Sequence, residues 1–113
     1  MPAYQTYAQK ARFTEVVSAT GPFKSAIEVC YQTQGANLTN CDSGENGVPA
    51  SLGASGVLSS VSWAVTNASA GVITATGNTT NFPSNNIYTL TAAGADGKIT
   101  WTASGSCSTG GLC

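Results

Sequence analysis

The sequence predicts an α+β domain in which a long N-terminal helix packs on a four-stranded antiparallel β-meander. In the first third of the chain, apolar residues recur at steps of three and four, which is the period of a helix. From Val57 onward they alternate with polar residues, and the connections between these runs are short. Because the 113 residues suit one compact domain, we expect one face of the sheet to bury against the helix.

Residues 1–34 form the predicted helix, and Gly35 is a plausible stop. One face of this helix collects the residues expected in the core: Val16, Ala19, Phe23, Ala26, Ile27 and Cys30. Gly21 and Pro22 interrupt the pattern. Proline has no N–H to donate inside a helix, so we expect a kink at Gly21-Pro22.

The first turns of this helix combine aromatic and small residues with few charges, namely Pro2, Tyr4, Tyr7, Ala11 and Phe13. Two interpretations are open. The segment is either the frayed start of a core helix, or a protrusion whose apolar groups need another partner.

Residues 35–56 form a long, turn-rich connection rich in Asn and Gly. Loops of this length in small domains are usually functional or packed surface features. The run from Asp42 to Gly47 loosely resembles a calcium loop, but its third position is Gly44 and its twelfth is Gly53, where a bidentate Glu belongs. We therefore expect turns here and no metal site.

Residues 57–104 contain four predicted strands, at 57–65, 72–77, 87–92 and 98–103. Asp96-Gly97 is a strong turn signal between the last two strands. Trp63 and Trp101 invite comparison with stacking platforms for bases or sugars. Each lies among alternating apolar residues, so we expect both in the core.

The four cysteines, in a chain without His, indicate disulfides and an oxidising compartment. Three pairings are possible, and none of the spacings is Cys-x-x-Cys. We favour the two local pairs, Cys30–Cys41 and Cys107–Cys113, because each closes a short loop. The second pair folds back a tail at residues 105–113.

Charge and composition exclude several functions. Four basic and five acidic residues give a net charge of −1, and the basic residues Lys10, Arg12, Lys24 and Lys98 are too few for binding DNA through phosphates alone. Without His, and without paired carboxylates or a nucleophile motif, we expect no enzyme activity, no cofactor and no metal.

The first thirty residues carry short runs in a fixed order: Pro2-Ala3-Tyr4-Gln5-Thr6-Tyr7, Ala11-Arg12, Glu15-Val16-Val17, and Lys24-Ser25-Ala26-Ile27-Glu28-Val29-Cys30. This order resembles bacterial type IV pilins of the IVa kind. Over residues 57–113 the similarity is one of layout only. The resemblance implies the pilin fold and a structural subunit of a surface filament for adhesion, motility or DNA uptake.

In such pilins the Pro-Ala-Tyr run follows an apolar helical stretch, so the resemblance implies that Met1 stands where that stretch ended. It also implies the partners: other pilin subunits, the inner membrane before assembly, the pilus assembly machinery, and host or abiotic surfaces, with DNA disfavoured. Neighbouring subunits would contact Pro2, Tyr4, Tyr7, Ala11 and Phe13.

The resemblance further implies that residues 35–56 and 107–113 are exposed and carry recognition. The Cys30–Cys41 pair is unusual, because many relatives have only the C-terminal bridge. It leaves a minor pilin, such as a receptor in DNA uptake, as an alternative. A type II secretion pseudopilin is a further alternative, although such proteins generally lack the C-terminal pair.

Overall fold

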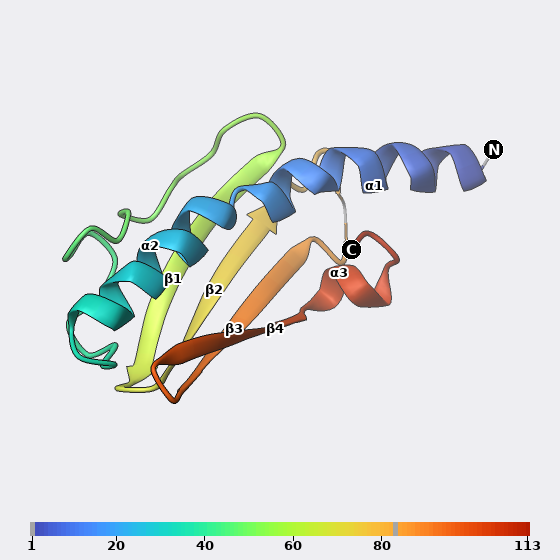
Figure 1. The fold of residues 1–113 in the computed structure, drawn as a ribbon. Coiled ribbons are helices and arrows are strands. Elements are labelled where there is room, and N and C mark those ends of the chain that lie inside the picture. Colours follow the sequence, from blue (N-terminus) through green and yellow to red (C-terminus); the bar gives the residue numbers. More distant parts are fainter. Residues whose placement is uncertain (1, 83) are drawn as a thin grey trace.

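The computed structural model describes residues 2–82 and 84–113, with side chains from residue 8 onward. It confirms the predicted fold class: helices pack on one face of a four-stranded antiparallel sheet (Figure 1). The elements are α1 (Pro2–Ser18), α2 (Gly21–Thr33), β1 (Leu58–Asn67), β2 (Ala70–Gly77), β3 (Ile87–Ala95), β4 (Lys98–Ser104) and α3 (Ser106–Thr109).

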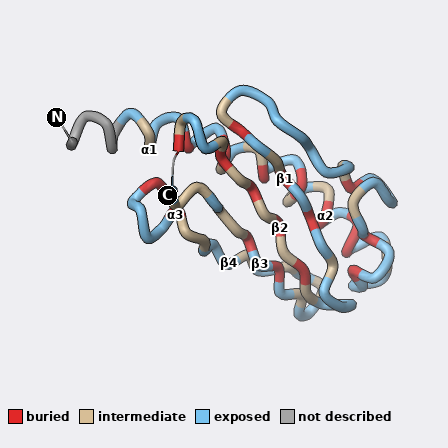
Figure 2. The backbone as a smooth tube through the Cα atoms, turned by 180° about the vertical axis from the view of Figure 1, so that it is seen from behind, coloured by how far each residue is buried: buried red, intermediate tan, exposed pale blue. Residues whose placement is uncertain are grey.

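The sheet is a meander with strand order β1-β2-β3-β4, so β1 and β4 are its two edges. Asp96 and Gly97 join β3 to β4 with positive φ angles of 55° and 75°, as expected for a tight hairpin turn. The inner strand β2 alternates between buried and half-buried residues along its length, and the buried ones include Ile73 and Ala75 (Figure 2). The core therefore lies between β2, its neighbours and the helices.

The helical third of the chain is divided into α1 and α2 by a short interruption. The interruption lies at Ala19 and Thr20, where the Thr20 N–H turns back to the Val17 carbonyl at 3.1 Å. The Thr20 hydroxyl donates to the same carbonyl at 2.7 Å, and Thr20 is buried. Gly21 and Pro22 occupy the first turn of α2, where the missing proline N–H costs no hydrogen bond. The interruption thus directly precedes Gly21-Pro22, where the sequence predicts a kink.

Two strand glycines set how closely the helices approach the sheet. At Gly77 in β2, a Cβ would lie 2.4 Å from the Phe82 ring and 3.4 Å from Phe13 of α1. At Gly94 in β3, a Cβ would lie 2.6 Å from the hydroxyl of Tyr31 in α2. These bare backbone sites let aromatic rings from the helices and the β2–β3 loop lie directly on the strands.

The two tryptophans have different surroundings. Trp63 on β1 is buried, as expected. Trp101 on β4 is only half-buried, and its indole N–H donates to the exposed Glu28 carboxylate of α2 at 3.1 Å. The prediction that Trp101 is core holds in part: its ring packs against the core, 6.1 Å from that of Trp63 between centroids, but β4 is an edge strand that α2 covers only in part.

Candidate subunit interfaces

Helix α1 extends well beyond the sheet, and we call its residues 2–12 the arm (Figure 1). The molecule is correspondingly long, with extents of 52 × 24 × 17 Å. Within the arm, Ala8, Lys10, Ala11 and Arg12 are exposed. An exposed helix with little charge is a surface suited to contact with another helix.

The predicted packing residues divide between the arm and the core. The arm includes the backbone of Pro2, Tyr4 and Tyr7, but their side chains lie outside the described part of the chain. Ala11 is exposed and free to contact a neighbour. Phe13 is fully buried, its ring edge-to-face with Phe82 at 5.1 Å between centroids. The expectation that Phe13 contacts other subunits is therefore wrong: α1 enters its own core at this residue.

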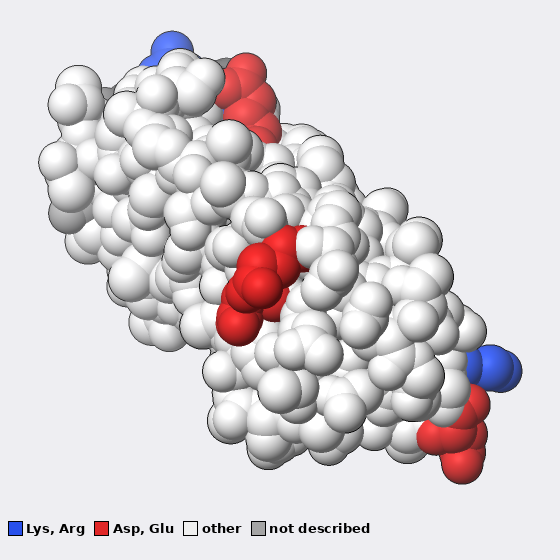
Figure 3. Space-filling view, turned by 90° about the vertical axis from the view of Figure 1, so that its left-hand side faces the viewer, with Lys and Arg blue, Asp and Glu red and all other residues white. Residues whose placement is uncertain are grey.

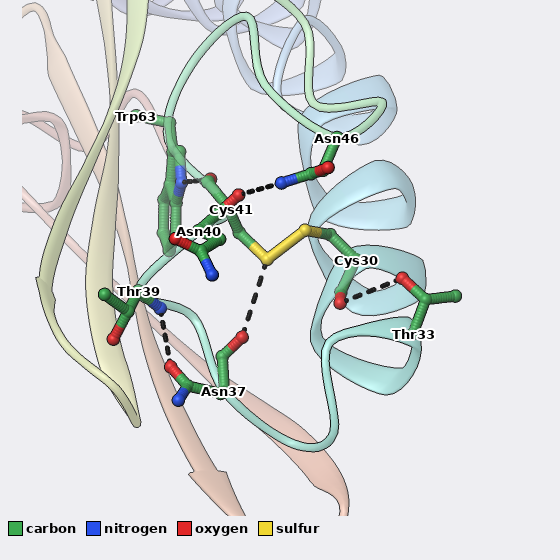
Figure 4. Close-up of a disulfide and its surroundings, with 8 residues drawn as sticks. All are labelled: Cys30, Thr33, Asn37, Thr39, Asn40, Cys41, Asn46 and Trp63. Carbon is green, nitrogen blue, oxygen red and sulfur yellow. Dashed lines mark hydrogen bonds between the residues drawn. A yellow bond between two sulfur atoms is a disulfide. The ribbon is translucent and has the colours of Figure 1, made fainter.

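The connection between α2 and β1 is held firmly, with Leu38, Cys41 and Val48 buried. A disulfide joins Cys41 to Cys30 of α2, with 6.0 Å between their Cα atoms (Figure 4). The Trp63 indole N–H donates to the Cys41 carbonyl at 2.7 Å, and the Ser43 hydroxyl donates to the Trp63 carbonyl at 3.2 Å. The disulfide and these hydrogen bonds tie the connection to both the helix and the sheet.

Polar side chains in the turns of this connection form hydrogen bonds with its own backbone. The Asn37 side-chain oxygen accepts from the Thr39 N–H at 2.8 Å, and the Asn46 amide donates to the Asn40 carbonyl (Figure 4). Asp42 and Glu45 are exposed. Across residues 2–82 and 84–113, no three His, Cys, Asp or Glu side chains are grouped so as to hold a metal ion.

The C-terminal tail is short and folded back. A disulfide joins Cys107 of α3 to Cys113, with 5.4 Å between their Cα atoms. Cys107 and Leu112 are buried, whereas Cys113 is exposed. The tail meets β3 at a close approach, because a Cβ on Gly105, whose φ is +117°, would lie 2.4 Å from the Ile87 carbonyl oxygen.

Two surface hollows lie at opposite edges of the sheet. One hollow, of about 540 Å³, lies beside β1 and is lined mainly by residues 52–56, with Glu15 and Ala19 from the helical segment. The other, of about 360 Å³, lies between Val17, β3, β4 and the tail, and we call it the tail hollow. Tyr88 lines the tail hollow, and desolvation by burial raises the pKa of its hydroxyl, so this tyrosine is uncharged near neutral pH.

Few charged side chains interrupt the surface. Figure 3 shows one end of the molecule, on which a few acidic and basic side chains lie among uncharged ones. In the part of the chain that the structure describes, no helix has the length and apolar character needed to cross a membrane. The hollows and the exposed side chain of Leu52 had no signal in the sequence, since both arise where segments distant in the chain meet.

Comparison with known proteins gives three matches. The family model described as "Pilin (bacterial filament)" matches residues 9–110. The chain is 57% identical over 117 residues to the "Type IV pilus subunit protein TapA" of Aeromonas hydrophila, covering 100% of this chain and 82% of that protein. It is 41% identical over 49 residues to the "Prepilin peptidase-dependent protein D" of Escherichia coli (strain K12), covering 43% of this chain and 33% of that protein.

Proposed function

The chain belongs to the pilin family of bacterial filament proteins, and from this premise we propose that it is the repeating structural subunit of a type IV pilus. The observation that carries the proposal is the 57% identity, along the whole chain, to a type IV pilus subunit. A structural subunit in an extracellular filament assembles with other pilin subunits. The alternatives of a DNA receptor and of a secretion pseudopilin are not favoured by this match.

The arm is the surface that we propose for packing inside the filament. Pro2, Tyr4, Tyr7 and Ala11 would contact the helices of neighbouring subunits, while the sheet and the loops face outward. The exposure of Ala8 and Ala11, beside Lys10 and Arg12, supports this role. Small residues on an exposed helix let a second helix approach closely.

The protein acts by assembly and not by catalysis, in our proposal. Its surface hydroxyls and amides suit packing and adhesion, and the exposed parts of residues 35–56 and 107–113 are what we propose to meet host or abiotic surfaces. The two disulfides suit an oxidising location outside the cytoplasm.

Before assembly, we propose that the subunit is held in the inner membrane by an apolar helix that continues α1 toward the N-terminus, and that pilus assembly machinery extracts it from there. Family membership supports this step. Fractionation of cells that lack the assembly machinery tests it: the full-length protein should sediment with the inner membrane, and recovery from the periplasm alone would contradict it.

Deletion of the gene, followed by electron microscopy of the cell surface, tests the structural role. Cells without the gene should lack type IV pili, and a plasmid copy should restore them. Intact pili on the deletion strain would overturn the proposal of a repeating subunit. Binding of purified pili to DNA, with the strong salt dependence of phosphate contacts, would instead favour a receptor in DNA uptake.

A further inference from the structure

We propose that Leu52 of one subunit inserts into the tail hollow of a second copy of this chain. The proposal rests on the proposed function, since it names one contact by which the subunits of the filament recognise each other. It assigns the two sides of a head-to-tail interface to opposite edges of the sheet.

Leu52 is the inserting side chain. It is 48% exposed, one of three large hydrophobic residues exposed on the described surface, with Val29 and Ile87. Its backbone is fixed, because the Leu52 N–H donates to the Val61 carbonyl at 2.9 Å and the Val61 N–H donates back at 3.0 Å. A leucine held outward on a rigid backbone loses little further backbone entropy when it binds.

The sequence around Leu52 is free of charge. Residues 49–56 contain only Pro, Ala, Ser, Leu and Gly. These small neighbours let a partner surface come close to Leu52, and Glu15 is the one charged residue that lines the described hollow beside it.

The tail hollow offers an apolar space of about 360 Å³, which is large enough to admit a leucine side chain. Its described lining consists of Val17, Tyr88, Ala103, Ser104, Ser108 and Cys113, without any Lys, Arg, Asp or Glu. The exposed lining is mainly apolar, and the neutral Tyr88 ring forms one wall. A leucine side chain buried here gains the free energy of apolar burial with no ionic group to desolvate.

The two surfaces stand at opposite edges of the sheet. Leu52 pairs with β1, which is one edge, whereas Ala103 and Ser104 belong to β4, which is the other. Joining different surfaces of identical subunits gives a heterologous contact, and such contacts propagate into open helical filaments when the rotation does not close. A face that paired with itself would instead end at a dimer.

We assign a second copy as the occupant because one molecule carries both parts of the contact, an exposed leucine and a hollow without charged residues. The chain also belongs to a family of filament proteins. A lipid chain or an unrelated apolar peptide has no such counterpart on the other edge. Either one, if it were the natural occupant, would leave filament assembly insensitive to Leu52.

The test is a charge-complementation experiment with the full-length protein expressed in its own deletion strain. Leu52→Glu would place a carboxylate in the apolar hollow, and Ala103→Lys would place an ammonium group at its rim. Each single variant should lower the amount of sheared surface filament by about tenfold or more, because an unpaired charge is desolvated at the contact. The double variant L52E/A103K should recover most of the loss, since the two charges then pair across the interface.

A matched control uses Val29, which is 62% exposed and lies on α2, away from both hollows. The double variant V29E/A103K should not recover the filaments lost with Ala103→Lys alone. Immunoblots of whole cells under non-reducing conditions should show equal subunit levels for all variants, as expected for exposed positions.

Normal filaments from Leu52→Glu would overturn the inference while leaving the structural role intact. So would equal rescue by V29E/A103K, which would indicate a general effect of charge, or failure of L52E/A103K to exceed its single variants. Absence of the wild-type protein from sheared filaments is a separate result, and it would overturn the proposed function itself.

Discussion

The two disulfide-closed segments of this chain look alike in sequence but differ in how they are attached. The Cys30–Cys41 bridge spans 11 residues, and both of its cysteines are fully buried. The Cys107–Cys113 bridge spans 6 residues, with Cys107 fully buried and Cys113 exposed. The first bridge lies wholly within the core, whereas the second joins a buried cysteine to the exposed last residue of the tail, so the two bridges differ in how much of each is buried.

Removal of the core bridge should have the largest effect. In the chain-entropy model, the double variant C30A/C41A loses the stabilisation of about 3 kcal/mol that comes from closing this loop in the unfolded chain. It also loses the packing of two buried sulfur atoms. We expect a total loss of about 4 kcal/mol in the free energy of unfolding, measured by urea denaturation of the domain. A loss below about 1 kcal/mol would show that the bridge adds little to a core already held by other contacts.

Removal of the tail bridge should cost less. The double variant C107A/C113A loses about 2 kcal/mol by the same entropy argument, and the effect should be confined to the tail. Hydrogen exchange should accelerate at residues 105–113 while the protection of β2 stays unchanged. Faster exchange throughout the sheet would mean that the tail is as much a part of the core as the connection between α2 and β1.

Two serines allow the same comparison with a smaller expected effect, because the hydroxyl of each takes part in one hydrogen bond of 3.2 Å to the backbone of a strand. The Ser43 hydroxyl donates to the Trp63 carbonyl in the core region, and the Ser106 hydroxyl oxygen accepts from the Ile87 N–H at the tail. Ser43→Ala should lower the free energy of unfolding by about 1 kcal/mol. Ser106→Ala should leave the urea midpoint nearly unchanged and only speed hydrogen exchange of the tail, so equal shifts in the midpoint would remove the distinction.

The sequence predicted the regular parts of this fold because they follow from periodicity and local chemistry. The alternation after Val57 located the strands, and Asp96-Gly97 located a turn that the structure places between β3 and β4. The helical spacing also predicted that Val16, Phe23 and Ile27 are buried. Each of these inferences depends only on residues a few positions apart.

The errors concern positions that long-range packing decides. Phe13 follows the aromatic and small residues of the arm in sequence, and its neighbours suggest an exposed position. In the structure, Phe82 from the loop after β2 covers it. Trp101 alternates like a core residue, yet its place on an edge strand leaves it half open. Likewise, the proposed contact between Leu52 and the tail hollow depends on their lying at opposite edges of the sheet, and no local sequence pattern encodes that arrangement.

The smallest expected effect distinguishes the tail region by pH. Burial raises the pKa of Tyr88 above its ordinary value near 10, so the folded state holds this proton longer than the unfolded chain does. Below pH 10 the hydroxyl is neutral in both states and contributes no pH dependence. As the pH rises past 10 the unfolded chain ionises first, and stability falls until the folded-state pKa is reached. Tyr88→Phe should flatten this fall without changing stability at pH 7, which urea titrations between pH 8 and 11 can measure.

In assembled filaments the proposed insertion of Leu52 desolvates the Tyr88 hydroxyl further. Ultraviolet titration should therefore place Tyr88 ionisation at higher pH in filaments than in the isolated domain. The same Tyr88 pKa in both would argue against a filled tail hollow.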